Sequence, residues 1–238
     1  MKNQQQEIFE TRARNILNYL NAQKRYDRDF FKPPFIVEFT GSPSSGKTTT
    51  IKQMYNFLRR HGFQVLIPQE GAEVIPARLR KSPDYNIQTG LYALKILLAE
   101  REEHRHDVIL FDRCLFDACH WMKYWMEQKK LSKKEAVNFV SFFSSERFTR
   151  SICLAYIMIC DQEIAVKREN EVAPSDKLGE TTNPASIEEM VHRFTAMHRK
   201  LSPRFPQLRL VDTTKLNKKE MVLRVGSEIL EILEEKSL

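Results

Sequence analysis

Apolar positions along the chain follow two alternating patterns. Short continuous apolar runs, typical of strands buried on both faces, lie at residues 35–39, 65–67, 107–111, 152–160 and 208–211. Between these runs apolar side chains recur at helical spacing, as after residue 48, where they fall at Ile51, Met54, Tyr55 and Leu58. Alternating strands and helices predict right-handed crossovers, so we expect an α/β fold: a parallel sheet with helices on both faces, in three layers.

Further helices are predicted over residues 87–104, 115–128, 133–148 and 218–233. The motif Ser132-x-x-Glu135 has the form of a capping box and predicts the start of the third of these helices. The same form, Ser186-x-x-Glu189, predicts the start of a helix before the last strand.

Two segments lie outside this alternation. In residues 1–32 apolar side chains recur on one helical face, which predicts a packed N-terminal helical extension. We expect this extension to cover the sheet as a lid and not to form a separate domain. The stretch from Lys167 to Pro184 is polar and contains proline and glycine, so we expect a mobile loop there. We interpret residues 1–238 as a single domain.

Composition limits the class of protein. The chain has 238 residues, of which 42% are hydrophobic, enough for one substantial core. It has no apolar run long enough to span a membrane and no N-terminal apolar signal segment, so we expect a cytoplasmic protein without a membrane partner. The four cysteines lack C-x-x-C spacing, which favours ordinary core residues over a zinc site or disulfides. The net charge of +7 suits an anionic ligand without choosing between nucleotides, nucleic acid and acidic lipid.

One motif points to specific chemistry. The segment Gly41-Ser42-Pro43-Ser44-Ser45-Gly46-Lys47-Thr48 matches G-x-x-x-x-G-K-[ST] and joins a predicted strand to a predicted helix, which is the context of a phosphate-binding loop. Backbone N–H groups, the helix N-terminus with Thr49 and the Lys47 ammonium would surround the phosphates of ATP. The Thr48 hydroxyl can ligate Mg²⁺.

Acidic and basic residues at strand ends complete the candidate site. Asp112 ends an apolar strand, where a carboxylate can share the Mg²⁺ with Thr48; its alternative role is to cap the following turn. Arg113 could stabilise charge on the transferred phosphoryl group, or form a salt bridge at the sheet edge.

Two residues are candidates for contact with the phosphoryl acceptor. Glu70 follows a short strand at its carboxyl end, where it could accept the proton of an attacking hydroxyl or be a surface residue of a turn. Gln88, in the first turn of a predicted helix, could read the edge of a base or face solvent.

Together, the phosphate loop and Phe111-Asp112-Arg113 resemble the nucleoside and nucleotide kinases, the group of thymidylate kinases and deoxynucleoside kinases, over most of residues 35–233. The segments around Arg101 and Thr213 are also similar to this group. The resemblance implies that Asp112 serves Mg²⁺ and catalysis, that Arg113 and Arg101 face the acceptor, and that Thr213 lies near adenine. It also implies that residues 167–185 form a lid from which Arg168 closes over the phosphates.

The function we expect is phosphoryl transfer from Mg²⁺-ATP to a small acceptor, a nucleoside or nucleoside monophosphate. Two alternatives stay open: a regulatory ATPase that uses ATP occupancy as a switch, and a kinase of a macromolecule such as a polynucleotide. A GTPase is disfavoured because no Asn-Lys-x-Asp motif occurs. Nucleic acid is a less favoured partner than a small molecule, and a homodimer is compatible with the sequence.

Overall fold

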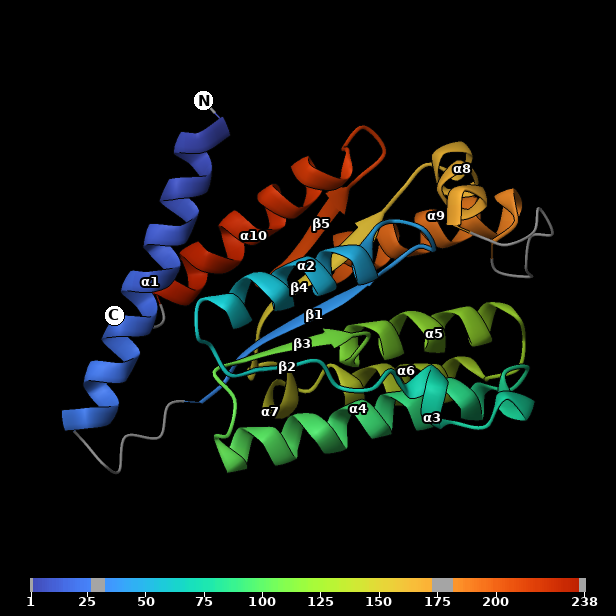
Figure 1. Ribbon diagram of the computed structural model, residues 1–238. Coiled ribbons are helices and arrows are strands. Elements are labelled where there is room, and N and C mark those ends of the chain that lie inside the picture. The colour runs from blue at the N-terminus through green and yellow to red at the C-terminus, as the bar shows by residue number, and fades with distance from the viewer. Residues whose placement is uncertain (1, 27–32, 173–181, 236–238) are drawn as a thin grey trace.

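The centre of the molecule is a parallel sheet. A computed structural model describes residues 2–26, 33–172 and 182–235. The sheet has five strands in the order β2-β3-β1-β4-β5, and every neighbouring pair is parallel (Figure 1). The strands are β1 (Phe35–Gly41), β2 (Val65–Leu66), β3 (Val108–Asp112), β4 (Ile152–Ile159) and β5 (Leu208–Asp212). The α/β fold predicted from the alternating pattern is therefore confirmed.

Helices cover both faces of this sheet. They are α1 (Lys2–Tyr26), α2 (Lys47–Arg60), α3 (Gly71–Val74), α4 (Pro83–Glu103), α5 (Leu115–Glu127), α6 (Lys133–Phe143), α7 (Glu146–Thr149), α8 (Gln162–Val172), α9 (Pro184–Leu201) and α10 (Lys218–Glu235), with a 3₁₀ turn at Ala77–Leu79. One face of the sheet packs against α2 and α10, and the other packs against α4, α5 and α9. None of the described helices is long and apolar enough to cross a membrane.

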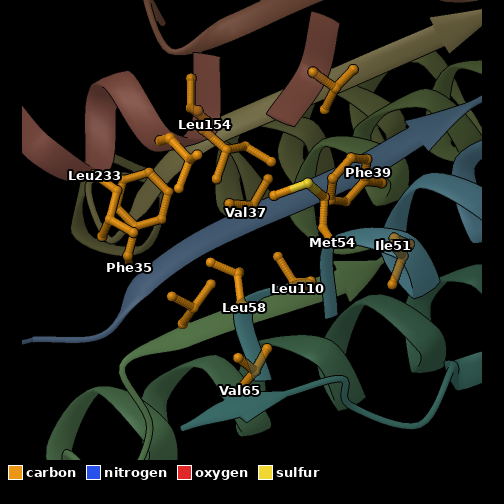
Figure 2. Packing of buried hydrophobic residues seen from close by; sticks show 14 of the residues in the cluster. Phe35, Val37, Phe39, Ile51, Met54, Leu58, Val65, Leu110, Leu154 and Leu233 are labelled. Atoms are coloured by element: carbon orange, nitrogen blue, oxygen red, sulfur yellow. The ribbon is translucent and has the colours of Figure 1, made fainter. Parts of the chain in front are cut away.

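Side chains of β1 alternate between the two cores. Phe35, Val37 and Phe39 point into the core beneath α2 and α10, where they meet Met54 and Leu58 (Figure 2). The intervening positions of the strand face the other helix layer, because successive side chains of a strand point to opposite faces. Full burial of each large apolar side chain stabilises the fold by about 1.5–3 kcal/mol.

The predicted N-terminal helix is present as α1. It packs against the α2–α10 layer: the Phe9 ring meets the Phe57 ring edge-on at 5.2 Å, and Arg12 pairs with Glu234 at 2.9 Å. A side chain at Gly226 of α10 would collide with Phe9, so this glycine lets the two helices approach closely.

Several helix boundaries differ from the prediction. Helix α4 begins at Pro83, before Ile87, because the Ser82 hydroxyl caps it by accepting from the Asp84 N–H. The predicted helix 133–148 is two helices, α6 and α7, separated at Ser144 and Ser145. The capping box at Ser132 is confirmed.

Two further differences concern the polar stretch before α9. Helix α9 is capped by Asn183, whose Oδ1 accepts from the Ser186 N–H at 3.0 Å, so the predicted capping box at Ser186 is wrong. Pro184 in the first turn fixes this earlier start. Lys167 and Arg168 belong to helix α8, so the predicted loop is wrong for residues 167–172. Residues 173–181 of the predicted lid lie outside the described residues.

A buried carboxylate connects the sheet to α5. Glu38, in the middle of β1, is fully buried and accepts hydrogen bonds from the backbone N–H groups of Cys114, Phe116 and Asp117 at 2.9–3.1 Å. These donors belong to the N-terminus of α5, where the helix dipole favours negative charge. Burial raises the pKa of Glu38 to about 7, while the three N–H donors oppose that rise.

We predict that Glu38→Gln lowers the free energy of unfolding by about 1–3 kcal/mol at about pH 8. The amide replaces one accepting oxygen with an NH₂ group, which then faces a backbone N–H in the core. Urea unfolding followed by circular dichroism measures the change, with exposed Glu231→Gln on α10 as the matched control. Equal stability of the two variants would show that the cap at α5 contributes little.

Candidate active site

The phosphate loop has the backbone geometry that its sequence requires. Gly41, Ser44 and Gly46 all have positive φ, at 131°, 52° and 92°. A Cβ at Gly41 would lie 1.8 Å from the Met158 carbonyl oxygen, and one at Gly46 would lie 2.3 Å from the Met221 sulfur. Only glycine fits these two positions, so β4 and α10 fix the path of the loop.

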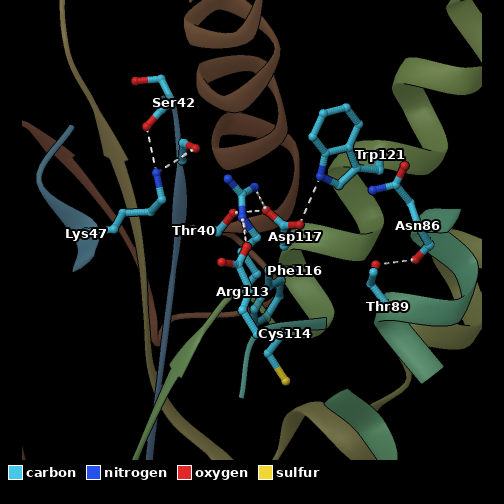
Figure 3. A network of polar contacts seen from close by, with 12 residues as sticks. Thr40, Ser42, Lys47, Asn86, Thr89, Arg113, Cys114, Phe116, Asp117 and Trp121 are labelled. Atoms are coloured by element: carbon cyan, nitrogen blue, oxygen red, sulfur yellow. Dashed lines mark hydrogen bonds and ion pairs between the residues drawn. The ribbon is translucent and has the colours of Figure 1, made fainter. Parts of the chain in front are cut away.

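Lys47 lies inside this loop. Its ammonium donates to the carbonyl oxygens of Ser42 at 2.7 Å and Gly41 at 3.2 Å (Figure 3). The side chain is buried, and this burial, together with the charge of Arg113, lowers the pKa of Lys47 to about 8. The remaining loop positions pack closely: Ser42 and Ser45 are buried, while Pro43 and Thr49 are half-buried.

The two predicted metal ligands meet at the carboxyl edge of the sheet. The Thr48 hydroxyl donates to Asp112 Oδ2 at 2.9 Å. Register explains this meeting: Asp112 pairs with Phe39 of β1, just before the loop. A hydroxyl and a carboxylate are hard oxygen donors, so the pair fits Mg²⁺.

Arg113 links two carboxylates at the same edge. Its Nε lies 3.0 Å from Glu70 Oε1, and its Nη1 lies 3.0 Å from Asp117 Oδ1. Although burial opposes its charge, the carboxylates of Asp117, Asp112 and Glu70 raise the pKa of Arg113. The backbone at Arg113 is left-handed, with φ of 69°, which costs about 1–3 kcal/mol and directs the side chain toward these partners.

Asp117 is a site residue that the sequence analysis missed. Besides Arg113, its carboxylate accepts from the Thr40 hydroxyl at 2.6 Å and from the Trp121 indole N–H at 2.9 Å (Figure 3). Its position four residues after Arg113 on a helix could have revealed this ion pair. Glu38 was missed too, although a lone acidic residue inside an apolar strand is a recognisable signal.

A cavity of about 570 Å³ opens beside this network. Glu70, Asp112 and Arg113 border it, together with aromatic and polar residues of α4 and α5. Burial raises the pKa of Glu70, and Arg113 opposes the rise. The structure thus brings three of the predicted catalytic residues to one cavity next to the phosphate loop.

Two predicted acceptor-binding residues are not brought to this cavity. Gln88 is exposed, and the cavity is lined instead by its neighbours Asn86 and Thr89. Arg101 lies near the opposite end of α4, roughly 24 Å along the helix axis from Tyr85. Its guanidinium pairs with Glu102 at 2.9 Å.

Arg168 and Thr213 lie behind the phosphate loop. The Arg168 guanidinium donates to the carbonyl oxygens of Ser44 at 3.3 Å, Thr213 at 2.8 Å and Leu216 at 2.9 Å. The Thr213 hydroxyl donates to the Ser45 carbonyl oxygen at 3.0 Å and is fully buried. These contacts tie the loop to α8 and to the segment between β5 and α10.

Known proteins share this fold. The AAA domain family model matches residues 36–143, the part that holds the phosphate loop and Asp112. Deoxyadenosine kinase from M. mycoides with the products dCMP and a flexible dCDP is similar in structure, with a TM-score of 0.62 and 16% identity over 83% of this chain and 99% of that chain. The fold is that of a deoxyadenosine kinase. The predicted resemblance to phosphate-loop nucleoside kinases is confirmed at the level of the fold.

The same bacterial enzyme solved with dATP gives a TM-score of 0.58 at 16% identity, over 82% of this chain and 98% of that chain. With dCTP bound, it gives 0.57 at 15% identity, over 83% and 99%. No curated protein sequence matches this chain. The kinase fold is therefore shared at low sequence identity.

We predict that ATP affinity falls as the pH rises above about 8. Because the pKa of Lys47 is lowered to about 8, its ammonium is charged below that pH and neutral above it, and the charged form attracts the phosphates. Titration calorimetry with ATP from about pH 7 to pH 9 measures the effect. Lys47→Met should bind weakly with little dependence on pH in this range, whereas exposed Lys52→Met on the same helix should behave as wild type. A wild-type affinity that stays constant across the range would contradict this role of Lys47.

Proposed function

We propose that the protein transfers the γ-phosphoryl group of ATP to a hydroxyl of a nucleoside. The observation that carries the proposal is the position of Glu70: it borders the cavity, pairs with Arg113, and lies at the same edge of the sheet as Asp112. A carboxylate there can accept a proton from a hydroxyl held in the cavity. The similar bacterial kinases, solved with deoxynucleotides, support a nucleoside as the acceptor.

Charge at this end of the cavity favours a nucleoside over a nucleoside monophosphate. Arg113 has three acidic neighbours, Glu70, Asp112 and Asp117, which already balance its charge. An acceptor that carried its own phosphate would be repelled by these carboxylates, whereas a neutral hydroxyl would not.

The phosphate loop would bind the nucleotide. Its backbone N–H groups and Lys47 would hold the β and γ phosphates, after Lys47 exchanges its contacts with Ser42 and Gly41 for the ligand. Thr48 and Asp112 would hold Mg²⁺, which when bound neutralises charge on the phosphates.

Glu70 and Arg113 would act at the acceptor. Glu70 takes the proton of the acceptor hydroxyl while the hydroxyl oxygen forms a bond to the γ phosphorus of ATP. The bond between the γ phosphorus and the oxygen that bridges it to the β phosphate breaks, which releases ADP. Arg113, fixed by Asp117, stabilises negative charge that develops on the transferred group.

We predict that Asp112→Ala lowers turnover by about a hundredfold or more, because one electrostatic contact to the transition state is worth roughly 3 kcal/mol. Lys47→Ala should have a similar effect. Product mass after incubation with ATP, Mg²⁺ and a panel of nucleosides and nucleoside monophosphates measures transfer. Asp84→Ala, an exposed change on α4, is the control. Near wild-type transfer by folded Asp112→Ala would remove that residue from its role.

The same panel tests the alternatives. Release of phosphate from ATP with every acceptor unmodified would favour a regulatory ATPase, and the AAA domain match gives that candidate its support. Transfer to short oligonucleotides alone, weakened by salt, would favour a macromolecular acceptor.

We predict that Glu70→Gln lowers kcat by about 10²- to 10⁴-fold, because the amide keeps the contact with Arg113 but cannot accept a proton. The pH profile of kcat/KM gives a second readout. Burial raises the pKa of Glu70, so wild-type activity should fall as the pH drops through this raised pKa, and the variant should lose this acid limb. Exposed Glu73→Gln on α3 is the matched control. An unchanged acid limb in Glu70→Gln would assign the proton acceptor elsewhere.

A further inference from the structure

A basic surface borders the cavity at the end away from the sheet. Two segments that are distant in the sequence form it: the residues between α3 and α4, and the turn between α5 and α6, which lie side by side in Figure 1. Lys130 joins them, because its ammonium donates to the Lys81 carbonyl oxygen at 2.7 Å and lies over the Trp125 ring. We call this surface the basic rim, and its cations are Arg78, Arg80, Lys81, Lys129, Lys130, Lys133 and Lys134.

The charge of the basic rim is not balanced by the protein. All seven cationic residues are exposed, and the two stretches that hold them, residues 77–84 and 127–135, contain only three carboxylates. Two of these carboxylates have other partners: Glu127 pairs with Lys123 and Arg193, and Glu135 belongs to the capping box of α6. Five cations form no ion pair in the part of the chain that the structure describes, namely Arg78, Arg80, Lys129, Lys133 and Lys134. The rim therefore attracts anions.

Three of these lysines occupy positions where local structure disfavours them. Lys133 and Lys134 are the first two residues of α6, where positive charge opposes the helix dipole. Lys129 has a φ of 56°, a left-handed conformation that glycine or asparagine adopts more easily. Local stability does not account for lysine at these positions, whereas an anionic ligand at the rim does.

The two ends of the cavity carry opposite charge. Arg80 and Lys130 line it at the rim, whereas Asp112 and Asp117 line it at the sheet edge. Asp117 and Glu127 are ten positions apart on α5, roughly 15 Å along the helix axis, and Lys130 follows the end of that helix. A ligand that suits both ends is neutral where it meets the carboxylates and anionic where it meets the rim.

We infer that the basic rim binds the phosphodiester backbone of a single-stranded oligonucleotide whose terminal nucleoside enters the cavity. The inference rests on the proposed function, in which the terminal hydroxyl then takes the place of the nucleoside hydroxyl, with the same proton transfer to Glu70 and the same release of ADP. A strand matches the charge pattern, because its end is a neutral nucleoside and each following unit adds one phosphate. The end of a duplex does not match, because its terminal nucleoside is paired and stacked.

Titration calorimetry tests this inference without phosphoryl transfer. The ligands are deoxyadenosine, deoxycytidine and deoxythymidine, each compared with its own single-stranded tetramer, which has three internal phosphates. At about 50 mM salt, wild type should bind at least one tetramer about 10-fold or more tightly than its nucleoside. The logarithm of the tetramer affinity should fall against the logarithm of the salt concentration with a slope of about −0.7 for each phosphate contacted, whereas nucleoside affinity should hardly change.

The rim variant combines Arg78→Gln, Lys133→Gln and Lys134→Gln. These three residues do not line the cavity, and the loss of cations from the first turn of α6 does not weaken that helix. The variant should lose most of the tighter binding of the tetramer and show a shallower salt dependence, because fewer phosphates are contacted. Its affinity for the free nucleoside should match that of wild type.

Three controls isolate the role of the rim. Lys95→Gln, Arg199→Gln and Lys200→Gln together remove the same charge at exposed positions of α4 and α9, and this variant should bind the tetramer as wild type does. A tetramer with a phosphate on both terminal hydroxyls should bind about 10-fold more weakly, because the carboxylates repel either end. A peptide with three aspartates should bind weakly, since it has no nucleoside for the cavity.

The outcomes separate this inference from the proposed function. Salt-dependent binding of the tetramer that only the rim variant loses supports the inference even where no phosphoryl transfer occurs, a result that would contradict the proposed function alone. Transfer to nucleosides by wild type, with no tetramer bound more tightly than its nucleoside, overturns the inference alone. It is also overturned if the rim variant and the control variant lose equal affinity, or if the doubly phosphorylated tetramer or the peptide binds as tightly as the tetramer.

Discussion

The pairing of β1 with β3 is the constraint on which the site depends. Phe39 lies opposite Asp112, and the Arg113 N–H donates to the Phe39 carbonyl oxygen at 2.8 Å. The phosphate loop continues directly from β1, so this register places Thr48 against Asp112 and directs Arg113 to Glu70. A slip of one residue would exchange the β3 side chains between the two cores, with Ile109 and Phe111 taking the places of Val108 and Leu110, so close packing in both cores holds the register that the chemistry needs.

Buried polar groups between β1 and α5 stabilise the carboxyl edge of the sheet, where the candidate site lies. Glu38 accepts three N–H donors at the start of α5, and Asp117, in the first turn of that helix, binds Thr40 and Arg113. Each of these buried groups has partners, which removes most of the cost of burying charge. The left-handed backbone at Arg113 persists because these contacts hold the residue from both sides.

The sequence was most informative where function depends on local or strand-end residues. The phosphate loop is contiguous, and Asp112 ends an apolar strand, so both could be placed from spacing alone. The side chains of α4 could not be placed in this way. Whether Gln88 or Asn86 faces the cavity depends on the rotation of the helix about its axis, which is decided by packing against α5. The acceptor-binding role of Arg101 was inferred from the family resemblance alone, and in the structure Arg101 lies at the far end of α4. At the start of α9 both Asn183 and Ser186 are residue types that cap helices. Pro184, which suits the first turn of a helix, favours Asn183 as the cap.

The close fit around Gly41 and Gly46 has a consequence for the order in which the molecule is made. The loop precedes the elements that shape it: the Ser42 N–H donates to the Met158 carbonyl oxygen of β4, and Gly46 packs against Met221 of α10. A nascent polypeptide on the ribosome therefore holds the nucleotide-binding segment long before it holds the elements that shape it. Such long-range dependence slows folding, and the loop can reach the shape that binds a nucleotide only after α10 has been synthesised.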